Sequence, residues 1–446
     1  MTTTAIGPGP QTRTQTRPAE ERPPATATDS TSAPASLWRN RDFLKFWSGE
    51  TLSLLGTQVT TLALPLTAVI AFDATPEQVG LLRFLQLVPY LALALVFGVL
   101  VDRMRRRRVM LLANGARMVL IGLVPLLAVT HHLDLPVLLT LACAIGVFSV
   151  LFDVSWMSFV PTLVKDPKHY VEANQKLGVT SSAADVAGPG LAGVLVGALS
   201  APVALLVDAF SYLVSLVTLL TIRTPEPRPE PPAQGRHLGR ELAEGLRWVF
   251  GDRVLRPLAL VAPFCNFSMV SVWTVFVLYA VRDQGLTPTQ LGIVFSASSV
   301  GGLAGAAVSG RVVKRFHLGT VYAVSMAAIF ASPLLLPFVH ASKPVVTALF
   351  VGSFFISYLG LGVAGVVMVS LRQTLTPQPL MGRMNAAFRT LLFGGGSLGG
   401  LLGGVIGGAL GLRAGLAAIA VGSTLMLVPL ALSPVSRLRR LPPPAA

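Results

Sequence analysis

The sequence predicts an all-α membrane protein whose twelve transmembrane helices form two six-helix pseudo-repeats. Of its 446 residues, 52% are hydrophobic and only 12% are charged, whereas a soluble domain typically carries about 25% charged residues. Apolar runs long enough to cross a bilayer recur along the chain, and the two halves of the sequence echo each other at a nearly constant offset. So few charges could not cover the surface of a soluble protein of this size.

The apolar runs set the number of spans, because a bilayer core of roughly 30 Å requires about 20 apolar residues in a helix. Six such runs precede a break in the pattern and six follow it. The predicted spans are 43–72, 79–101, 109–130, 136–160, 176–199, 202–222, 257–281, 289–310, 318–339, 344–369, 386–410 and 412–433.

The segments outside the spans complete the domain organisation. Residues 1–36 are rich in Thr, Pro, Ala and Arg, and we expect them to form a disordered cytoplasmic tail. The two six-helix halves are predicted at 37–222 and 257–440. Between them, 223–256 is a cytoplasmic linker with five prolines and a stretch of apolar residues at helical spacing. That stretch fits an interfacial amphipathic helix, and an ordinary linker is the alternative.

The positions of Lys and Arg predict the orientation. Basic clusters such as 103–108, 311–315 and 437–440 fall on one side of the predicted topology, and the opposite side receives only Arg282, Lys343 and Arg413. Basic loops face the cytoplasm, so we expect a multi-pass protein of the bacterial cytoplasmic membrane with both termini inside. The formal net charge of +15 is explained by this asymmetry, and we expect no nucleic-acid partner.

An internal repeat relates the two halves. The motif at 75–80 (TPEQVG) recurs at 287–292 (TPTQLG), 212 residues later, and three further matches follow in order at equivalent topological positions. These pairs are Gly98 and Gly310, Asn174 and Asn385, and Gly193 and Gly404. Two six-helix units around a central cavity are the scaffold on which alternating access operates by rocking.

A glycine, an acidic residue and a basic run connect the second and third spans. These residues are Gly98, Asp102, Arg103, Arg106 and Arg107. A carboxylate at the end of one helix can face the positive N-terminus of another, and guanidiniums can bond carbonyls and carboxylates across the seam between the halves. We interpret the segment as a cytoplasmic gate, and a plain topology signal is the alternative.

This segment and the duplicated topology resemble the major facilitator superfamily over residues 38–440. In that family the segment latches the outward-facing state, and here Arg105 stands where a second glycine is usual. Further stretches resemble the drug-exporter branch that includes enterobactin-exporter-like and macrolide-efflux-like proteins. They are Pro161–Val164, Glu172–Asn174, Gly188–Gly193, Asp208–Leu213 and Gln373–Arg383. The resemblance implies the twelve-helix fold and a secondary transporter that exports small molecules.

Gly188, Pro189 and Gly193 mark a flexible or tightly packed point in the fifth span. Proline removes one helix hydrogen bond, and glycine allows close contact between helices. We predict a hinge or packing seam here, and the resemblance links similar runs to export as opposed to import.

Several ionisable residues lie inside predicted spans, where they usually face a cavity or a partner. Glu50, Arg117, Asp153 and Asp185 lie at similar depth, roughly 10–15 Å from the cytoplasmic ends of their helices. We group them as an intramembrane charge cluster in which at least one carboxylate exchanges a proton, or which binds a cationic group. A static ion pair of Arg117 with Asp153 or Glu50 is the structural alternative.

The remaining predictions concern substrate and energy source. Asn266, Trp273 and Tyr358 are candidates to line a substrate cavity, with packing as the alternative. We found no catalytic motif, no metal-ligand spacing and no phosphate-binding Gly-rich loop, so we expect neither an enzyme nor an ATP-driven pump. We expect a monomer without a cofactor that uses the proton gradient to export an amphipathic drug, antibiotic or siderophore-like metabolite. A flippase for lysophospholipids or other lipids and a membrane sensor remain alternatives.

Overall fold

The computed structural model describes residues 1–3, 7, 37–164, 169–226 and 238–439. Within these residues twelve helices are long and apolar enough to cross a membrane, and no strand occurs. The predicted fold class is therefore confirmed. The tail predicted at 1–36 falls almost entirely outside the described residues.

Each predicted span corresponds to one helix or to two consecutive helical segments, and most of them extend a few residues beyond the apolar run. The first half contains α1 (Arg41–Ala71), α2 (Pro76–Asp102), α3 (Arg106–Val129), α4 (Leu135–Leu163), α5 (Tyr170–Leu199) and α6 (Ala201–Thr221). The linker contains α7 (Leu238–Gly251). The second half contains α8 (Leu255–Arg282), α9 (Pro288–Arg315), α10 (Leu318–Ala331) with η3 (Ser332–Phe338), α11 (Lys343–Leu375), α12 (Met381–Leu410), and α13 (Leu412–Leu425) with α14 (Leu427–Leu432).

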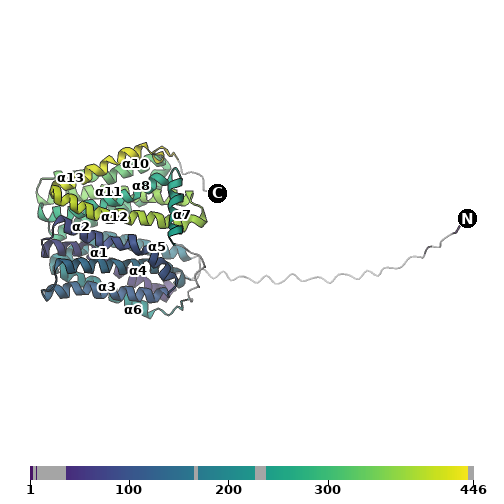
Figure 1. Cartoon of the computed structure of the whole chain (residues 1–446), viewed down its shortest axis with the longest axis horizontal. Coiled ribbons are helices and arrows are strands. Elements are labelled where there is room, and N and C mark those ends of the chain that lie inside the picture. The colour runs from purple at the N-terminus through teal and green to yellow at the C-terminus, as the bar shows by residue number, and fades with distance from the viewer. Residues whose placement is uncertain (4–6, 8–36, 165–168, 227–237, 440–446) are drawn as a thin grey trace.

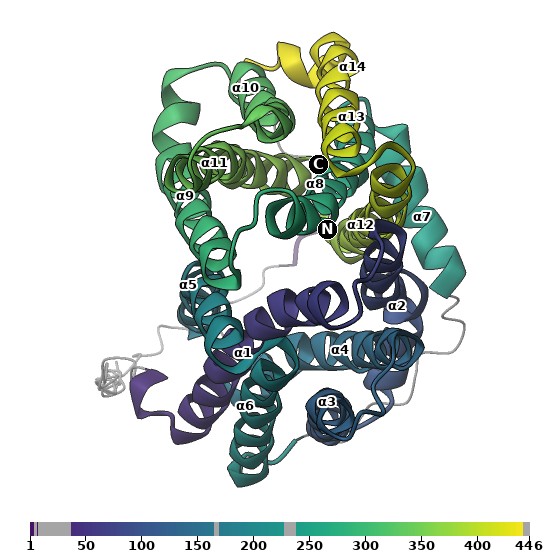
Figure 2. The ribbon, with the colours of Figure 1, turned by 90° about the vertical axis from the view of Figure 1, so that its left-hand side faces the viewer.

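The helices pack as two bundles that meet along a seam (Figures 1 and 2). In the first half, α1 packs against α5 and α6, and α3 packs against α4 and α6. In the second half, α11 packs against α9 and α10, and α12 packs against α8 and α13. Two helix pairs close the seam, α2 against α12 and α5 against α9. Helix α7 lies against α12 and α8, so it belongs with the second half.

The repeated motif performs the same local task in each half. At Thr75 and at Thr287, the threonine hydroxyl accepts a hydrogen bond from the backbone N–H of the glutamine three residues later, and the glutamine side-chain oxygen accepts one from the threonine backbone N–H. Proline at the first helical position needs no N–H partner. The repeat therefore begins α2 and α9 with equivalent capping boxes.

Glycines of the repeat bring the two halves into backbone contact. A Cβ at Gly80 of α2 would lie 2.8 Å from the Cα of Gly404 in α12. A Cβ at Gly193 of α5 would lie 2.9 Å from the Cα of Gly292 in α9. Carbon atoms of real side chains do not approach this closely, so the seam requires glycine at these positions. Gly80 pairs with Gly404 and Gly193 with Gly292, and the two contacts are related by the internal repeat.

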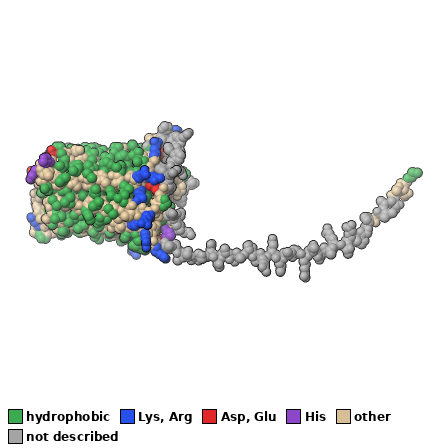
Figure 3. Space-filling view, turned by 90° about the horizontal axis from the view of Figure 1, so that it is seen from below, with side chains coloured by type: hydrophobic (Ala, Val, Ile, Leu, Met, Phe, Trp, Pro, Cys, Tyr) green, Lys and Arg blue, Asp and Glu red, His purple; other side chains and the backbone are tan. Residues whose placement is uncertain are grey.

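One end of the bundle is basic. Lys and Arg gather at the end formed by the start of α1, the connection between α2 and α3, and the end of α9 (Figure 3). We call this the basic end. The seam glycines lie near the opposite end, close to the starts of α2 and α9. By contrast, a Cβ at Gly98 or Gly310, toward the basic end, would meet no atom within 4 Å.

The buried apolar side chains follow the same division. One cluster toward the end opposite the basic end is continuous across the halves and includes Leu62 and Val79 together with Val272 and Phe295. Toward the basic end the core splits into one cluster in each half, around Phe159 in the first and Phe330 in the second. The halves are thus joined by apolar packing at one end and separate in their packing at the other.

Candidate functional site

A cavity of about 460 Å³ lies between the halves and is lined mainly by α8 and α11. Asn266 and Trp273 of α8 and Tyr358 of α11 all line it, so the structure brings the three cavity candidates together. The amide nitrogen of Asn266 donates to the Leu392 carbonyl at 2.7 Å. The hydroxyl of Tyr358 forms no hydrogen bond within the described part of the chain and is available to a ligand.

Arg83 of α2 completes this cavity from the first half. Its guanidinium lies over the Trp273 ring, 3.6 Å from the ring centroid. Its Nη atoms donate to the Gln86 side chain at 3.1 Å and to the Thr61 carbonyl at 3.3 Å. Arg83 lies within the predicted span 79–101, but no local pattern marks it, because the ring that it covers lies 190 residues away on the other half.

A second cavity of about 420 Å³ shares Trp273 and Tyr358 with the first. Asp185 lines it from α5, and its carboxylate accepts a hydrogen bond from the Gln58 side chain at 2.7 Å. The two cavities therefore flank the same pair of aromatic side chains, one with a guanidinium and the other with a carboxylate.

A third cavity of about 610 Å³ lies between the halves toward the basic end. Tyr90 lines it from the first half, and Arg372, Asn385 and Arg389 line it from the second. The Tyr90 hydroxyl donates to Asp153 at 2.8 Å and its ring stacks on Phe393 with 4.4 Å between centroids. Leu392 lines both this cavity and the first, so the two are neighbours.

The buried charges of the first half gather around Arg117 of α3. Glu50, Asp153 and Asp208 each interact electrostatically with its guanidinium, which also covers the rings of Phe152 and Tyr212 at 4.2 and 4.3 Å. Within the described residues, however, no carboxylate oxygen forms an ion pair with Arg117. The guanidinium instead donates to the side chain of Asn114.

The membership of this group differs from the expected cluster. Asp185 lies apart, because α5 packs against α1 and α9 whereas α3 packs against α4 and α6. Asp208 of α6, which was not among the expected members, takes its place. The sequence shows how deep a residue lies along its helix. Which helices that residue faces depends on how the helices pack.

The three carboxylates around Arg117 differ in their hydrogen bonds. Asp153 accepts from Tyr90, and Asp208 accepts from Thr60 and Ser211. One oxygen of Glu50 is buried and has no donor. Glu50 is therefore the member whose negative charge the protein supports least.

The segment around Pro189 is bonded across the seam. The hydroxyl of Ser296 in α9 accepts from the Gly190 N–H at 2.7 Å and donates to the Val186 carbonyl at 2.5 Å. A regular helix joins these two backbone groups directly, so Ser296 inserts into the hydrogen-bond ladder of α5 at the predicted hinge. Gly188 packs on Gln58, and Gly193 packs on Gly292. Sequence analysis missed Ser296, since a serine within a span carries no distinguishing signal.

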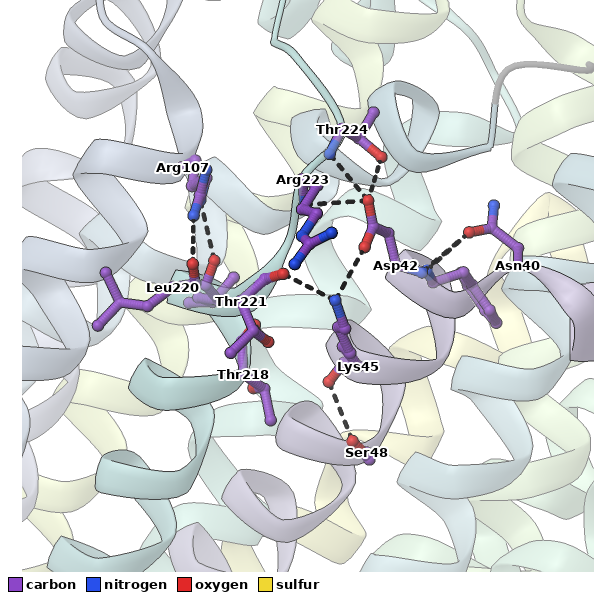
Figure 4. A network of polar contacts seen from close by, with 12 residues as sticks. Asn40, Asp42, Lys45, Ser48, Arg107, Thr218, Leu220, Thr221, Arg223 and Thr224 are labelled. Carbon is purple, nitrogen blue, oxygen red and sulfur yellow. Dashed lines mark hydrogen bonds and ion pairs between the residues drawn. The ribbon is translucent and has the colours of Figure 1, made fainter.

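The predicted gate segment contacts its own half. Arg107 donates to the carbonyls of Leu219 and Leu220 at 2.9 and 2.8 Å, at the end of α6 (Figure 4). The N–H groups of Arg106 and Arg107 donate to Glu226 at 2.5 and 3.2 Å, and Arg103 is exposed. Among the described residues, the hydrogen bonds of Arg106 and Arg107 stay within the first half, where the two halves are separate in their packing. The side chain of Asp102 lies outside the described residues.

The chain that follows α6 is fastened to the first half by a polar network (Figure 4). Asp42 of α1 accepts from the backbone N–H groups of Arg223 and Thr224 at 3.1 and 2.8 Å and from the Thr224 hydroxyl at 2.7 Å. Lys45 donates to the Thr221 carbonyl at 2.7 Å. In the second half, Glu244 of α7 pairs with Arg383 at 2.6 Å. The two ends of the linker are thus fastened to different halves.

Comparison with known families identifies the scaffold. The model of the Major Facilitator Superfamily matches residues 46–399 and 264–446. The chain belongs to this superfamily. It is 25% identical over 353 residues to the multidrug efflux pump Tap of Mycolicibacterium fortuitum, covering 77% of this chain and 84% of that protein. It is 27% identical over 309 residues to the enterobactin exporter EntS of Salmonella choleraesuis, covering 68% of this chain and 71% of that one.

Solved structures of the superfamily share the fold. The nucleoside transporter NupG superposes with a TM-score of 0.73 at 10% identity, covering 88% of this chain and 98% of its own. A bacterial homologue of the lysosomal transporter Spinster, in an inward-facing conformation, gives a TM-score of 0.67 at 17% identity, covering 90% and 97%. This major facilitator protein is therefore a multi-pass membrane transporter with efflux-pump relatives, and the relatives are transporters rather than enzymes.

Proposed function

We propose that this chain exports an amphipathic small molecule across the bacterial cytoplasmic membrane by alternating access, driven by the proton gradient. The inter-half cavity carries the proposal. It is lined largely by aromatic and apolar side chains and offers a few polar groups, the composition typical of a site for drug-sized ligands. The names of the relatives Tap and EntS, an efflux pump and an exporter, favour the outward direction.

The proposed orientation places the basic end in the cytoplasm, because Lys and Arg concentrate there. The seam contacts of Gly80 and Gly193 then close the periplasmic side, and the third cavity lies on the cytoplasmic side. Substrate would enter from the cytoplasm and leave after the halves rock about the central cavity.

The charge group around Arg117 supports proton coupling. Arg117 acts on the three carboxylates of Glu50, Asp153 and Asp208, and Arg389 also acts on Asp153. Two guanidiniums facing three carboxylates leave one excess negative charge, which a proton can remove. Glu50 has a buried oxygen without a donor, and we propose it as the proton carrier. Protonation there would be coupled to the conformational change through α1, which contacts both α5 and α6.

Uptake into inside-out vesicles tests the proposal. Vesicles containing the protein should accumulate amphipathic compounds when the vesicle lumen is made acidic, so that protons leave as substrate enters, and accumulation should stop when the gradient is collapsed. Vesicles without the protein provide the background. Uptake that is independent of the gradient would contradict proton coupling, and the absence of uptake for a broad panel of amphipathic compounds would contradict export.

A further inference from the structure

Arg83 is a buried charge within a membrane span that forms no ion pair with any described residue. A guanidinium has five N–H donors, and the described residues provide acceptors only in the Gln86 side chain and the Thr61 carbonyl, both neutral. Its Nε–H is buried and has no acceptor. Intramembrane charges are costly unless they serve a partner or a ligand. The protein thus maintains at this cavity a cation whose bonding capacity is not filled.

Stacking holds this guanidinium in a defined position. Its Cζ atom lies over the Trp273 ring, 3.6 Å from the ring centroid, across the seam between the halves. When a guanidinium stacks on an aromatic ring, its N–H groups lie in the guanidinium plane and point outward, so they stay free to donate to other groups. The donors are therefore pre-oriented before any ligand arrives, which lowers the entropic cost of binding.

Tyr358 supplies a second donor beside Arg83. The two side chains interact electrostatically and line the same cavity, and the Tyr358 hydroxyl has no partner within the described residues. The remaining wall is largely apolar and includes Val272, Phe354 and Leu392. Two unfilled donors against an aromatic and aliphatic wall fit a ligand with one anionic group on a flat apolar body.

The charged side chains between the basic end and Arg83 also favour an anionic substrate. Arg83 is the charged side chain among the residues that line the first cavity. The neighbouring third cavity contributes Arg372 and Arg389, whose hydrogen bonds go to neutral side chains, and Arg389 also interacts electrostatically with Asp153. Asp153 faces that cavity through the Tyr90 hydroxyl, and Asp185 lies in the second cavity bonded to Gln58. A path from the basic end to Arg83 is therefore lined by guanidiniums, and the exposed carboxylate lies beyond Trp273 and Tyr358.

We propose that this cavity selects amphipathic anions, molecules with a carboxylate or an acidic phenol on a planar apolar body, by bonding the anionic group to Arg83 and Tyr358. The inference rests on the proposed export function and names its substrate class.

Equilibrium binding to the purified protein in nanodiscs tests the selectivity, with empty nanodiscs subtracted. Three probes share one body and differ in charge, namely naphthalene-1-carboxylate, its neutral carboxamide and 1-naphthylmethylamine. The wild-type protein should bind the carboxylate most tightly. Because a hydrogen bond to a charged group is lost, Arg83→Gln should weaken carboxylate binding roughly 10- to 150-fold. Its effect on the carboxamide should be much smaller, and Arg83→Lys should retain part of the preference.

Controls keep the result interpretable. Arg253→Gln removes an exposed arginine that lies outside the gate segment and the three cavities, and it should leave all three affinities unchanged. If Arg83→Gln does not fold, Tyr358→Phe provides a second test, since loss of its hydroxyl should weaken carboxylate binding by roughly threefold to tenfold. The inference is wrong if the wild-type protein fails to bind the carboxylate, binds the amine at least as tightly, or if both substitutions leave the carboxylate preference intact.

Binding and export can fail separately. Carboxylate binding that requires Arg83, without gradient-driven uptake in vesicles, would preserve the anion site and contradict export. Gradient-driven uptake of cations with affinities indifferent to Arg83 would preserve export and contradict the anion site.

Discussion

The seam glycines make a direct prediction about the conformational equilibrium. A Cβ at Gly193 would lie 2.6 Å from the Pro288 carbonyl oxygen and 2.9 Å from the Cα of Gly292. Both neighbours are backbone atoms and cannot rotate away. Gly193→Ala should therefore destabilise the conformation in which α5 and α9 touch. Overpacking of this kind costs about 1–3 kcal/mol, which corresponds to a shift of roughly 5- to 150-fold in the ratio of open to closed seam.

The same helix supplies the matched control. A Cβ at Gly178 of α5 would meet no atom within 4 Å, and alanine in a helix is more favourable than glycine by about 1 kcal/mol. Gly178→Ala should therefore leave the equilibrium unchanged and stability equal or higher.

Accessibility of a thiol at the seam measures the shift. Cys143 and Cys265 are first replaced by serine, and a cysteine is placed at Thr289, whose hydroxyl contacts the Gly193 carbonyl at 3.3 Å. An impermeant thiol reagent added to intact cells should label this site faster in Gly193→Ala than in Gly178→Ala. Equal labelling rates in the two variants would refute the idea that the glycine contact closes this end.

Three further predictions concern contacts away from the cavity. Ser296→Ala removes a bridge to α5 and should change the rate of transport more than the affinity for substrate, measured as initial rates and equilibrium binding. Glu226→Ala should lower the free energy of unfolding by about 1 kcal/mol, because α3 loses an N-terminal cap, whereas Glu226→Gln retains most of it in thermal unfolding. In the cysteine-free background, His132→Cys should react with impermeant reagents in intact cells and Arg253→Cys should not; the reverse pattern would overturn the proposed orientation.

The fold could be predicted from the sequence because it depends on features that can be read along the chain. Span number follows from the lengths of apolar runs, and the pairing of α2 with α9 as equivalents follows from the repeated capping motif. The amphipathic stretch in the linker likewise corresponds to α7 (Leu238–Gly251). The assignment of the linker and of the two halves as domains stays a prediction.

The site was predicted in part. Asn266, Trp273 and Tyr358 were chosen because each carries a polar tip within a predicted span of the second half. The structure places all three along one cavity. Sequence analysis did not identify Arg83 and Ser296 as site residues, because their partners lie on the opposite half and contacts across the seam leave no local sequence pattern. Depth alone grouped Asp185 with Arg117, whereas the packing of α3 brings Asp208 there instead. The role of Asp102 as a gate remains a prediction, and Asp102→Asn should impair transport without loss of membrane insertion.

Substrate-driven proton movement in proteoliposomes tests the central claim most directly. The protein is reconstituted with a pH-sensitive dye inside, and the amphipathic compound that gives the largest gradient-dependent uptake is added to wild type, Glu50→Gln and the control Glu172→Gln, whose carboxylate pairs with Lys176 at the basic end. We predict that wild type and the control couple substrate movement to protons, whereas Glu50→Gln binds the compound but transports it only down its own gradient. Concentrative transport by Glu50→Gln with unchanged pH dependence would contradict proton coupling through this residue.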